Sequence, residues 1–332
     1  MARVLLCGRG GALELPLIAS ALRDRGADPV VLDSSAYPTG AAVTLAYDRA
    51  GFRGHWAGDV HEPHAISAVW QNLVVGTALP EMSPGARETC VAASELAVIG
   101  LLDSLGVFQL DPRANQVRAD NKPHQLRIAQ CAGLDIPDTI VTNDPEAVRG
   151  FARRCGPVVA KMLVQPASTG PAVDGEASVV FTTALSDPDL EQLDGLDLCP
   201  MIFQQQIENR LDVRVTMVGR RVFAAAIDRE ARGGDDPDWR RQSYAEDRSL
   251  VWSSYELPGD VAERLVRLLD HFGLHYGAAD LIVRPDGGHV FLELNASGSF
   301  GFLGPDHAGP IARAIAEVLI DPGARRAARS VP

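Results

Sequence analysis

Asp280 and Glu293 are spaced so that they would face each other across a β-hairpin. Residues 276–303 contain two strand-like runs separated by Asp286-Gly287, and an Asp-Gly pair is a strong signal of a two-residue hairpin turn. Such a turn sets the register of its two strands. It predicts three opposed pairs, which are Arg284 with His289, Ile282 with Phe291 and Asp280 with Glu293.

A facing pair of acids needs a positive partner, because opposed Cβ atoms are about 5 Å apart and like charges there are destabilising. Mg²⁺ would be such a partner, since it takes one or two carboxylates together with phosphate oxygens. Asn295 lies two residues after Glu293 on the same face of the strand. The alternative is that both carboxylates point into water. The apolar neighbours on both strands and the Gly/Ser loop that follows favour the metal site.

The chain has only two lysines, Lys122 and Lys161. Lys122 falls in the first turn of a predicted helix, where the macrodipole favours negative charge. Lys161 falls in the apolar strand PVVAKML. For each, the alternative is a side chain that extends from the edge of its element into solvent. Together with the small, glycine-containing segment 165–178, the lysines and the acids would make a phosphate-binding site with a lid.

These residues need an α/β (α+β) framework to position them. Strands at 3–7 and 29–33 around a helix that ends at Arg25 predict a βαβ opening, although Leu13 replaces the third glycine of a dinucleotide fingerprint. We expect an N-terminal domain over 1–115, a small central α+β subdomain over 116–200 and a C-terminal antiparallel-sheet subdomain over 201–325. A tail follows over 326–332.

Periodicity, caps and stop signals predict the individual elements. The predicted helices lie at 87–105, 120–131 with Asp120 as its cap, 144–155, 258–272 and 309–320. The predicted strands lie at 136–142, 157–163, 178–183, 201–207, 212–218, 221–228 and 249–256, with 201–207, 212–218 and 221–228 as consecutive antiparallel strands. Residues 34–85 hold an apolar run around Trp70. They also hold His55, His61 and His64, whose loop-like context favours solvated side chains over a metal site.

Composition narrows the classes of function. Of the 332 residues, 46% are hydrophobic, which is enough for two or three packed units. The net charge of −12 argues against nucleic acid as the main partner. No apolar run reaches the roughly 18 residues of a membrane span. Five scattered cysteines without CxxC spacing are typical of reduced thiols, so we expect a cytoplasmic protein.

Over about residues 115–320, the order of these parts resembles an ATP-grasp enzyme. The resemblance implies that Lys122 and Lys161 bind the nucleotide, that 165–178 is a lid over the phosphates, and that Asp212 precedes an arginine, Arg214, directed at the γ-phosphate. It implies a hinge along adenine formed by Gln204, Gln205, Gln206 and Ile207. It implies metal ligands at Asp280, Glu293 and Asn295. The implied cofactors are ATP and Mg²⁺, with two ions and with Mn²⁺ as a substitute.

Further stretches are similar to the ATP-grasp maturases of ribosomal peptides, the graspetide or microviridin-type ligases. They are TNDPEAVRGF at 142–151, LDVRVTMVGRRVFAAAI at 211–227, DWR at 238–240 and LELNASGSFGFL at 292–303. AVWQN at 68–72 and the stretch 100–126 are similar to that family's pre-ATP-grasp domain. Two departures concern the choice of peptide. Gln71 and Asn72 stand where the family often has arginines, and the family often has an aromatic residue near Gln109.

The family's reaction is the activation of a carboxylate in a precursor peptide. The γ-phosphoryl group passes to an Asp or Glu side chain, and a Ser or Thr hydroxyl or a Lys amine then closes the ring. The resemblance implies that Arg214 and Arg240 hold the phosphoryl group and the acidic substrate. It implies peptide contacts at Asp238, Trp239, Ser297 and Ser299. It also implies a leader-and-core precursor peptide as partner and a homodimer. The net charge and the lack of a long apolar run, not the resemblance, argue against nucleic-acid and membrane partners.

Several alternatives remain open on the sequence. The charged segment 229–248 would be a solvated loop and 297–301 a plain turn if neither met a substrate. A RimK-like ligase would add free amino acids to a peptide or small acid, whereas ring closure removes one water per link. A non-catalytic, nucleotide-dependent peptide-binding protein would release no ADP. A dehydrogenase built on the glycine turn at 8–11 would have to bind a nicotinamide cofactor.

Overall fold

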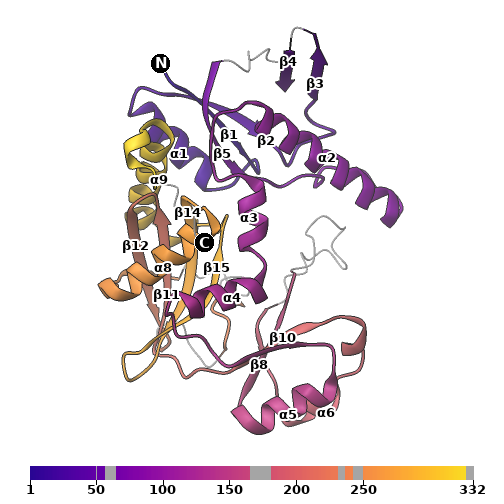
Figure 1. Ribbon diagram of the computed structural model, residues 1–332, viewed down its shortest axis with the longest axis vertical. Helices are drawn as coiled ribbons and strands as arrows, with labels where there is room; N and C mark the ends of the chain where they lie inside the picture. Colours follow the sequence, from indigo (N-terminus) through magenta and orange to yellow (C-terminus); the bar gives the residue numbers. More distant parts are fainter. Residues whose placement is uncertain (50, 57–64, 165–180, 231–235, 242–249, 327–332) are drawn as a thin grey trace.

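The computed structural model describes residues 1–49, 51–56, 65–164, 181–230, 236–241 and 250–326. Figure 1 shows an N-terminal part at the top, a C-terminal sheet with its helices at the lower left, and a smaller lobe at the lower right. Within the described residues the strands form one parallel sheet, two larger antiparallel sheets and a two-stranded hairpin. The predicted α/β class is confirmed. The predicted limits of the domains stay predictions.

The N-terminal part opens with the predicted βαβ unit. It consists of β1 (Arg3–Gly8), α1 (Glu14–Arg23) and β2 (Asp28–Asp33). β5 (Ile66–Asn72) contains Trp70 and lies parallel to β1, and β6 (Phe108–Leu110) completes the sheet in the order β2-β1-β5-β6. The C-terminal half of α2 (Pro84–Ser104) packs on this sheet through Val98, Leu101 and Leu102, and its exposed first half projects beyond the sheet (Figure 1).

The sequence pattern does not predict one hairpin of this part. β3 (Val43–Asp48) pairs with β4 (Gly51–Trp56), whose glycines interrupt the alternation of apolar and polar residues. Trp56 is buried against the N-terminal core and supplies the packing that local propensity lacks. His55 is exposed on β4, as expected of a solvated histidine. His61 and His64 lie outside the described residues.

The central sheet has the strand order β7-β10-β8-β9. Its strands are β7 (Thr139–Thr142), β8 (Val158–Met162), β9 (Thr183–Ala184) and β10 (Met201–Gln205). α5 (Pro145–Cys155), α6 (Asp187–Glu191) and the short helix η2 (Leu196–Leu198) complete the lobe. The expectation that 201–207 pairs with 212–218 is wrong. Phe203 instead packs with the core of the lobe, so β10 lies between β7 and β8.

The C-terminal sheet has the order β13-β12-β11-β14-β15. Its strands are β11 (Leu211–Val218), β12 (Arg221–Asp228), β13 (Ser253–Ser254), β14 (Tyr276–Val283) and β15 (His289–Asn295). α3 (Arg113–Ala119), α4 (Lys122–Cys131) and α8 (Gly259–Phe272) contribute to the hydrophobic cluster on one face. Since strand residues alternate between faces, Val213 and Val215 point to these helices, whereas Asp212 and Arg214 point to the opposite, polar face.

The β14–β15 hairpin reaches its register by a different route from the predicted one. The loop is one residue longer: the amide of Gly287 bonds to the carbonyl of Arg284, and Gly287 has φ 88°. Pro285 suits the second position of this type I turn, and glycine suits the left-handed position that follows. Val283 therefore pairs with His289, so the predicted pairs Arg284–His289 and Ile282–Phe291 are wrong.

A β-bulge compensates for the longer loop. The register shifts between Asp280 and Leu281, so that Leu281 pairs with Phe291 while Asp280 pairs with Glu293, as predicted. The residue inserted on β15 is Leu292. Leu292 and Glu293 both line the pocket on the polar face, whereas Phe291 and Leu294 are buried on the helix face. A bulge of this kind redirects a side chain beside a functional site.

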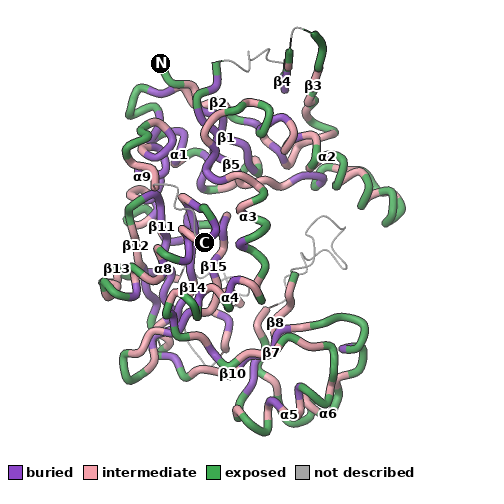
Figure 2. Tube along the Cα trace, in the orientation of Figure 1, coloured by how far each residue is buried: buried purple, intermediate pink, exposed green. Residues whose placement is uncertain are grey.

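The last helix, α9 (Pro305–Ile320), connects the two ends of the chain. It packs along α1, and the largest hydrophobic cluster combines Ile18 and Leu22 of α1 with Ile311 and Ile315 of α9 (Figures 1 and 2). The N-terminal part therefore shares its core with C-terminal residues. Short turns η3 (Gly301–Leu303) and η4 (Pro322–Ala324) flank α9. Within the described residues, no helix is both long and apolar enough to span a membrane.

Candidate active site

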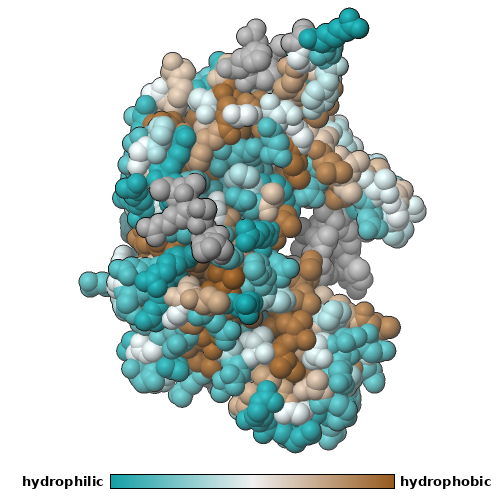
Figure 3. All heavy atoms as spheres, viewed as in Figure 1, coloured by the Kyte–Doolittle hydropathy of each residue, from teal (hydrophilic) through white to brown (hydrophobic). Residues whose placement is uncertain are grey.

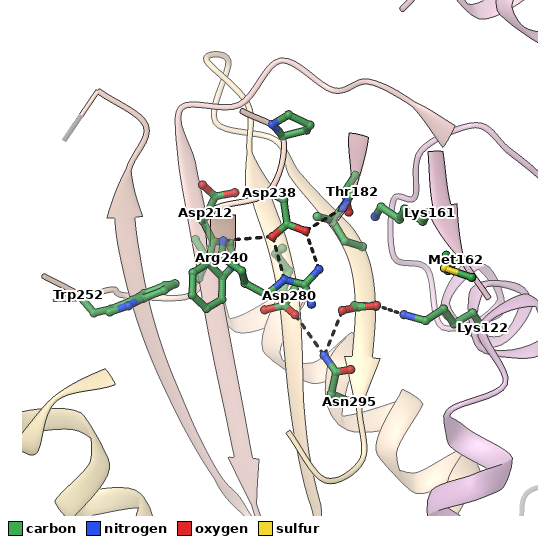
Figure 4. Close-up of a pocket in the computed structure, with 16 residues that line it drawn as sticks. Lys122, Lys161, Met162, Thr182, Asp212, Asp238, Arg240, Trp252, Asp280 and Asn295 are labelled. Atoms are coloured by element: carbon green, nitrogen blue, oxygen red, sulfur yellow. Dashed lines mark hydrogen bonds and ion pairs between the residues drawn. The ribbon is translucent and has the colours of Figure 1, made fainter. Parts of the chain in front are cut away.

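One pocket brings together most of the residues that the sequence predicts to act together. It lies between the central sheet and the polar face of the C-terminal sheet (Figure 4). Figure 3 shows the central lobe projecting beside the C-terminal sheet, with mostly hydrophilic side chains on the outer surface in this view. The predicted residues that line the pocket are Lys122, Lys161, Asp212, Asp238, Trp239, Arg240, Asp280, Glu293 and Asn295.

The facing acids lie at the floor of this pocket. Asp280 on β14 and Glu293 on β15 are register partners, and the amide nitrogen of Asn295 lies 3.2 Å from Oδ2 of Asp280 and 3.3 Å from Oε1 of Glu293. Figure 4 shows the side chains of Asp280 and Asn295 directed at each other. The juxtaposition predicted from the hairpin is therefore present.

The donor set fits a hard divalent cation. The two carboxylates provide oxygen ligands, which Mg²⁺ prefers, and Asn295 would add its amide oxygen by turning over its side chain, whose nitrogen faces the carboxylates here. Among the described residues, no three His, Cys, Asp or Glu side chains form a group that could hold a metal by themselves. A cation here would therefore need further oxygens from a ligand such as a phosphate chain. Asp280, Glu293 and Asn295 are the residues that would hold it.

Each acid also has a cationic partner. Nη1 of Arg214 lies 2.8 Å and 2.9 Å from the two carboxylate oxygens of Asp280, and Lys122 forms an ion pair with Glu293. Lys122 is the first residue of α4, whose cap is Asn121: its side chain accepts the amide of His124. The prediction that Asp120 caps this helix is wrong. Asp120 follows the last residue of the short helix α3, and its carboxylate accepts the backbone amide of Ala296.

Burial and charge shift the acids in opposite directions. Burial raises the pKa of Asp280 above its ordinary value, although Arg214 opposes the shift. Burial also disfavours the charged form of Glu293, but Lys122 and Lys161 outweigh it and lower its pKa. Desolvation lowers the pKa of Lys161, partly offset by Glu293. Glu293 is thus the stably ionised member of the pair, held by both lysines.

Arg240 enters the pocket from the short segment 236–241. Its Nε and Nη2 donate to the two oxygens of Asp238 at 2.8 Å and 2.7 Å, and Asp238 also accepts the amide of Thr182 at 2.9 Å. Burial alone would raise the pKa of Asp238. The hydrogen bonds from Arg240 and Thr182 outweigh burial, so the pKa of Asp238 is lower than its ordinary value. Asp238, predicted to contact the substrate, is buried and engaged with the arginine. Within segment 229–248, residues 231–235 and 242–248 lie outside the described residues.

Three other residues predicted to contact the peptide have protein partners. Trp239 packs against Trp252 and Phe302, with ring centroids 5.1 Å and 5.2 Å apart, and also borders the pocket. The hydroxyl of Ser299 donates to Glu14. The carbonyl of Ser297 accepts the side-chain amide of Asn72 at 3.2 Å. The loop after β15 is therefore tied to the N-terminal part.

A second cavity adjoins the first and shares Lys161, Thr182 and Leu292 with it. The predicted hinge residues line it, namely Gln204, Gln205, Gln206 and Ile207. The backbone amides of Gln205 and Gln206 donate to the carbonyls of Asp138 and Pro157, respectively. Asp138 directly precedes β7 and Pro157 directly precedes β8, so the segment is anchored to the starts of both neighbouring strands. The side chain of Gln204 donates to the hydroxyl of Thr139. A partly apolar cavity next to a charged pocket suits a base beside its phosphates. The lid predicted at 165–178 lies outside the described residues.

Sequence reasoning missed several residues at the site. Thr182 uses its backbone amide, which any residue type provides, so no sequence signal exists for it. Trp252 also lines the pocket. It lies 40 residues before Leu292 in the sequence, so only the fold shows that the two residues border the same pocket. Glu14 and Asn72 contact the loop after β15 from more than 200 residues away. For Glu14, a charged residue within an apolar helical pattern is a weak local signal.

Comparison with known proteins agrees with this geometry. Residues 13–117 match the family model described as the MvdD pre-ATP grasp domain. A probable alpha-L-glutamate ligase from Xanthomonas oryzae pv. oryzae (strain MAFF 311018) is 31% identical over 225 residues, which cover 65% of this chain and 70% of that protein.

Solved structures extend the likeness over the whole chain. The macrocyclase MdnC from Microcystis aeruginosa MRC, bound with precursor peptide MdnA, is 34% identical with a TM-score of 0.83, covering 96% of this chain and 99% of that one. A RiPP-associated ATP-grasp ligase from Chryseobacterium gregarium, in complex with ADP and a leader and core peptide, is 29% identical with a TM-score of 0.86 and full coverage of both chains. The chain belongs to the ATP-grasp ligases, in the group of the ribosomal-peptide macrocyclases.

Proposed function

We propose that this ligase macrocyclises a ribosomal precursor peptide at the expense of ATP. The observation that carries the proposal is the convergence of two carboxylates, an amide, two lysines and Arg240 on one pocket, with Arg214 bonded to Asp280 and a partly apolar cavity alongside. Support comes from similar structures that were solved with a precursor peptide or with a leader and core peptide, some of them together with ADP, AMPPNP or Mg.

In this proposal the protein positions charge and reacting groups. Lys122 and Lys161 neutralise the phosphate chain, and Asp280, Glu293 and Asn295 hold the cation. Bound Mg²⁺ would neutralise negative charge on the phosphate chain. Arg214 and Arg240 orient the γ-phosphoryl group and the acidic side chain of the peptide, since a guanidinium matches both groups.

The bond changes follow from this arrangement. A carboxylate oxygen of the peptide attacks the γ-phosphorus, the bond to ADP breaks, and an acyl phosphate forms. A hydroxyl or amine of the same peptide attacks the acyl carbon and phosphate leaves. The proton of the attacking hydroxyl or amine passes to the released phosphate or to solvent. The net change is one ester or amide link and one water lost from the peptide per link.

We also propose two metal ions, Mn²⁺ as a substitute, a homodimer and a cytoplasmic location.

Mass spectrometry of a reconstituted reaction tests the proposal. The substrate is a short peptide encoded beside this chain, with an acid-rich core that also contains Ser, Thr or Lys. With ATP and Mg²⁺, the wild type is expected to remove one water per link and release one ADP for each. Glu293→Gln should abolish the product because it removes the ionised metal ligand. Glu263→Gln, on the exposed side of α8, is the matched control and should react normally.

A second candidate is a RimK-like ligase that adds free amino acids, and the curated relatives named probable alpha-L-glutamate ligase favour it. In the same experiment with free glutamate present, it predicts mass gains of whole residues. Such gains without loss of water would reject the macrocyclase in favour of this ligase. Peptide binding without ADP release would instead support the non-catalytic alternative.

A further inference from the structure

A buried glutamate of the N-terminal part reaches the loop that follows the metal-site strand. Glu14 begins α1 and is only 5% exposed. Its Oε1 accepts the amide of Phe300 at 3.1 Å, the amide of Gly301 at 2.9 Å and the hydroxyl of Ser299. A buried carboxylate is costly unless it is hydrogen-bonded, and here all three donors belong to one short loop.

The same loop contacts the arginine proposed to orient the phosphoryl group. The carbonyl of Ser299 accepts Nη2 of Arg214 at 2.9 Å, while Nη1 of Arg214 is bonded to Asp280. Ser299 therefore donates through its side chain to Glu14 and accepts through its backbone from Arg214. Ser299 thus connects the N-terminal part to the guanidinium of Arg214. The side chain of Arg214 is only 6% exposed, so it has little room to change its orientation.

Close packing leaves the loop few other positions. A Cβ added at Gly298 would lie 2.7 Å from Nη2 of Arg214 and 2.8 Å from Cβ of Ala278. A Cβ added at Gly301 would lie 2.5 Å from Cβ of Leu13. The void between the loop, Glu14 and Tyr276 measures only about 10 Å³, roughly the space of one water. The backbone thus approaches both neighbours as closely as glycine allows.

We infer that Glu14 is a positioning residue for the ligase reaction: it fixes the 297–301 loop and, through Ser299, the orientation of Arg214. The inference rests on the proposed function, in which Arg214 contacts the reacting groups. It assigns the pre-ATP-grasp part a role in the geometry of the chemical step. Loss of Glu14 should therefore slow that step without weakening nucleotide binding, because the lysines and the hinge lie on other elements.

The test compares Glu14→Ala and Glu14→Gln with Glu88→Gln, a matched change on the exposed part of α2. Ring formation is followed in single-turnover experiments, Mg-ADP binding by calorimetry and stability by thermal unfolding. Glu14→Ala is expected to lower the single-turnover rate roughly 10- to 100-fold, as for a small misplacement of a reacting group, with the Mg-ADP Kd within about twofold of wild type. Glu14→Gln keeps an acceptor for both amides and should restore most of the rate. Glu88→Gln should match wild type.

Hydrogen exchange separates this inference from the proposed function. Glu14→Ala should speed exchange of the amides of 299–301 and leave the hinge at 203–207 unchanged, whether or not the chosen peptide reacts. If the wild type forms no ring, the proposed function fails while the exchange result still reports on the loop. If Glu14→Ala leaves exchange at 299–301 unaltered, reacts at the wild-type rate, or loses Mg-ADP binding in step with activity, the positioning role is overturned.

Discussion

Arg214 and Arg240 each have a carboxylate partner within the pocket. Arg214 is paired with Asp280 and Arg240 with Asp238, in both cases through two short contacts. Hydrogen bonds to Asp238 raise the pKa of Arg240, although burial opposes this. Two nitrogens of Arg240 engage the two oxygens of Asp238, so the planar fork fixes its orientation, whereas one nitrogen of Arg214 bonds to both oxygens of Asp280. The acids therefore orient the arginines that would meet a substrate, and Asp238 acts through Arg240.

Asp238→Asn tests this relation at the residue scale. The amide retains one acceptor for Arg240 but loses the paired geometry and the charge, so the guanidinium should rotate more freely. We expect kcat to fall about tenfold or more with a smaller change in the Kd for Mg-ADP. Single-turnover kinetics and calorimetry measure the two quantities. Asp194→Asn, an exposed change in the central lobe, is the control, and equal kinetics for both variants would contradict the prediction.

At the scale of elements, the β14–β15 hairpin sets the geometry of the acids. Its three-residue loop and its bulge each displace the register by one residue, and together they return Asp280 to Glu293. The strand face decides which side chains reach the pocket, because a slip of one residue would turn Glu293 towards the helices. The turn residues therefore contribute to function through register.

Gly287→Ala tests the turn. Gly287 has φ 88°, and nothing lies within 4 Å of an added Cβ, so the cost is that of the backbone conformation alone. We expect the free energy of unfolding to fall by about 1 kcal/mol, measured by urea denaturation. Gly259→Ala is the matched control: Gly259 begins α8, has equally open space and no positive φ, and should be neutral or slightly stabilising. Equal destabilisation by both changes would contradict a left-handed turn.

At the scale of the whole molecule, the N-terminal part is built into the ligase core. α9 returns to pack on α1, and Asp111, just after β6, accepts the backbone amides of His275 and Tyr276 at the start of β14. Asp111 is 1% exposed. The strand that carries Asp280 is thus held at its first residues by a carboxylate from the N-terminal part.

Asp111 predicts a pH dependence of stability. Burial raises its pKa to about 7, against the effect of the two amide bonds, whereas an unfolded aspartate titrates near about 3.9. Between about pH 4 and pH 7 Asp111 is protonated in the folded state and ionised in the unfolded state. The stabilisation from this bound proton is therefore complete below about pH 4 and is lost as the pH rises through about 7. The loss is at most about 4 kcal/mol between pH 4 and 8.

Urea denaturation of the wild type and of Asp111→Asn across this range measures the effect. The variant cannot titrate at this position, so its stability relative to the wild type should increase as the pH rises. A difference between the two proteins that stays constant from pH 5 to pH 8 would show that Asp111 does not titrate in this window.

Local chemistry in the sequence predicted the acid pair and most of the elements around it, whereas the length of the turn and the bulge that restores the pair were not predicted. α8 ends at Gly273 with φ 65°, and α5 begins at Pro145 after the Asp144 cap, as the sequence predicts, because caps and stops act over a few residues. Resemblance to a known family added the roles of Lys122 and Lys161. The structure brings these two lysines to the pocket, while their roles stay predictions.

Only the tertiary structure decided where those elements meet. β10 joined the central sheet because Phe203 fits that core, and the β3–β4 hairpin formed because Trp56 could be buried. Glu14 became part of the site because α1 and α9 share one core and bring residues almost 290 positions apart into contact. Hydrophobic burial and backbone hydrogen bonds are not specific to one pair of residues, so long-range pairings of this kind are settled by the packing of the whole chain.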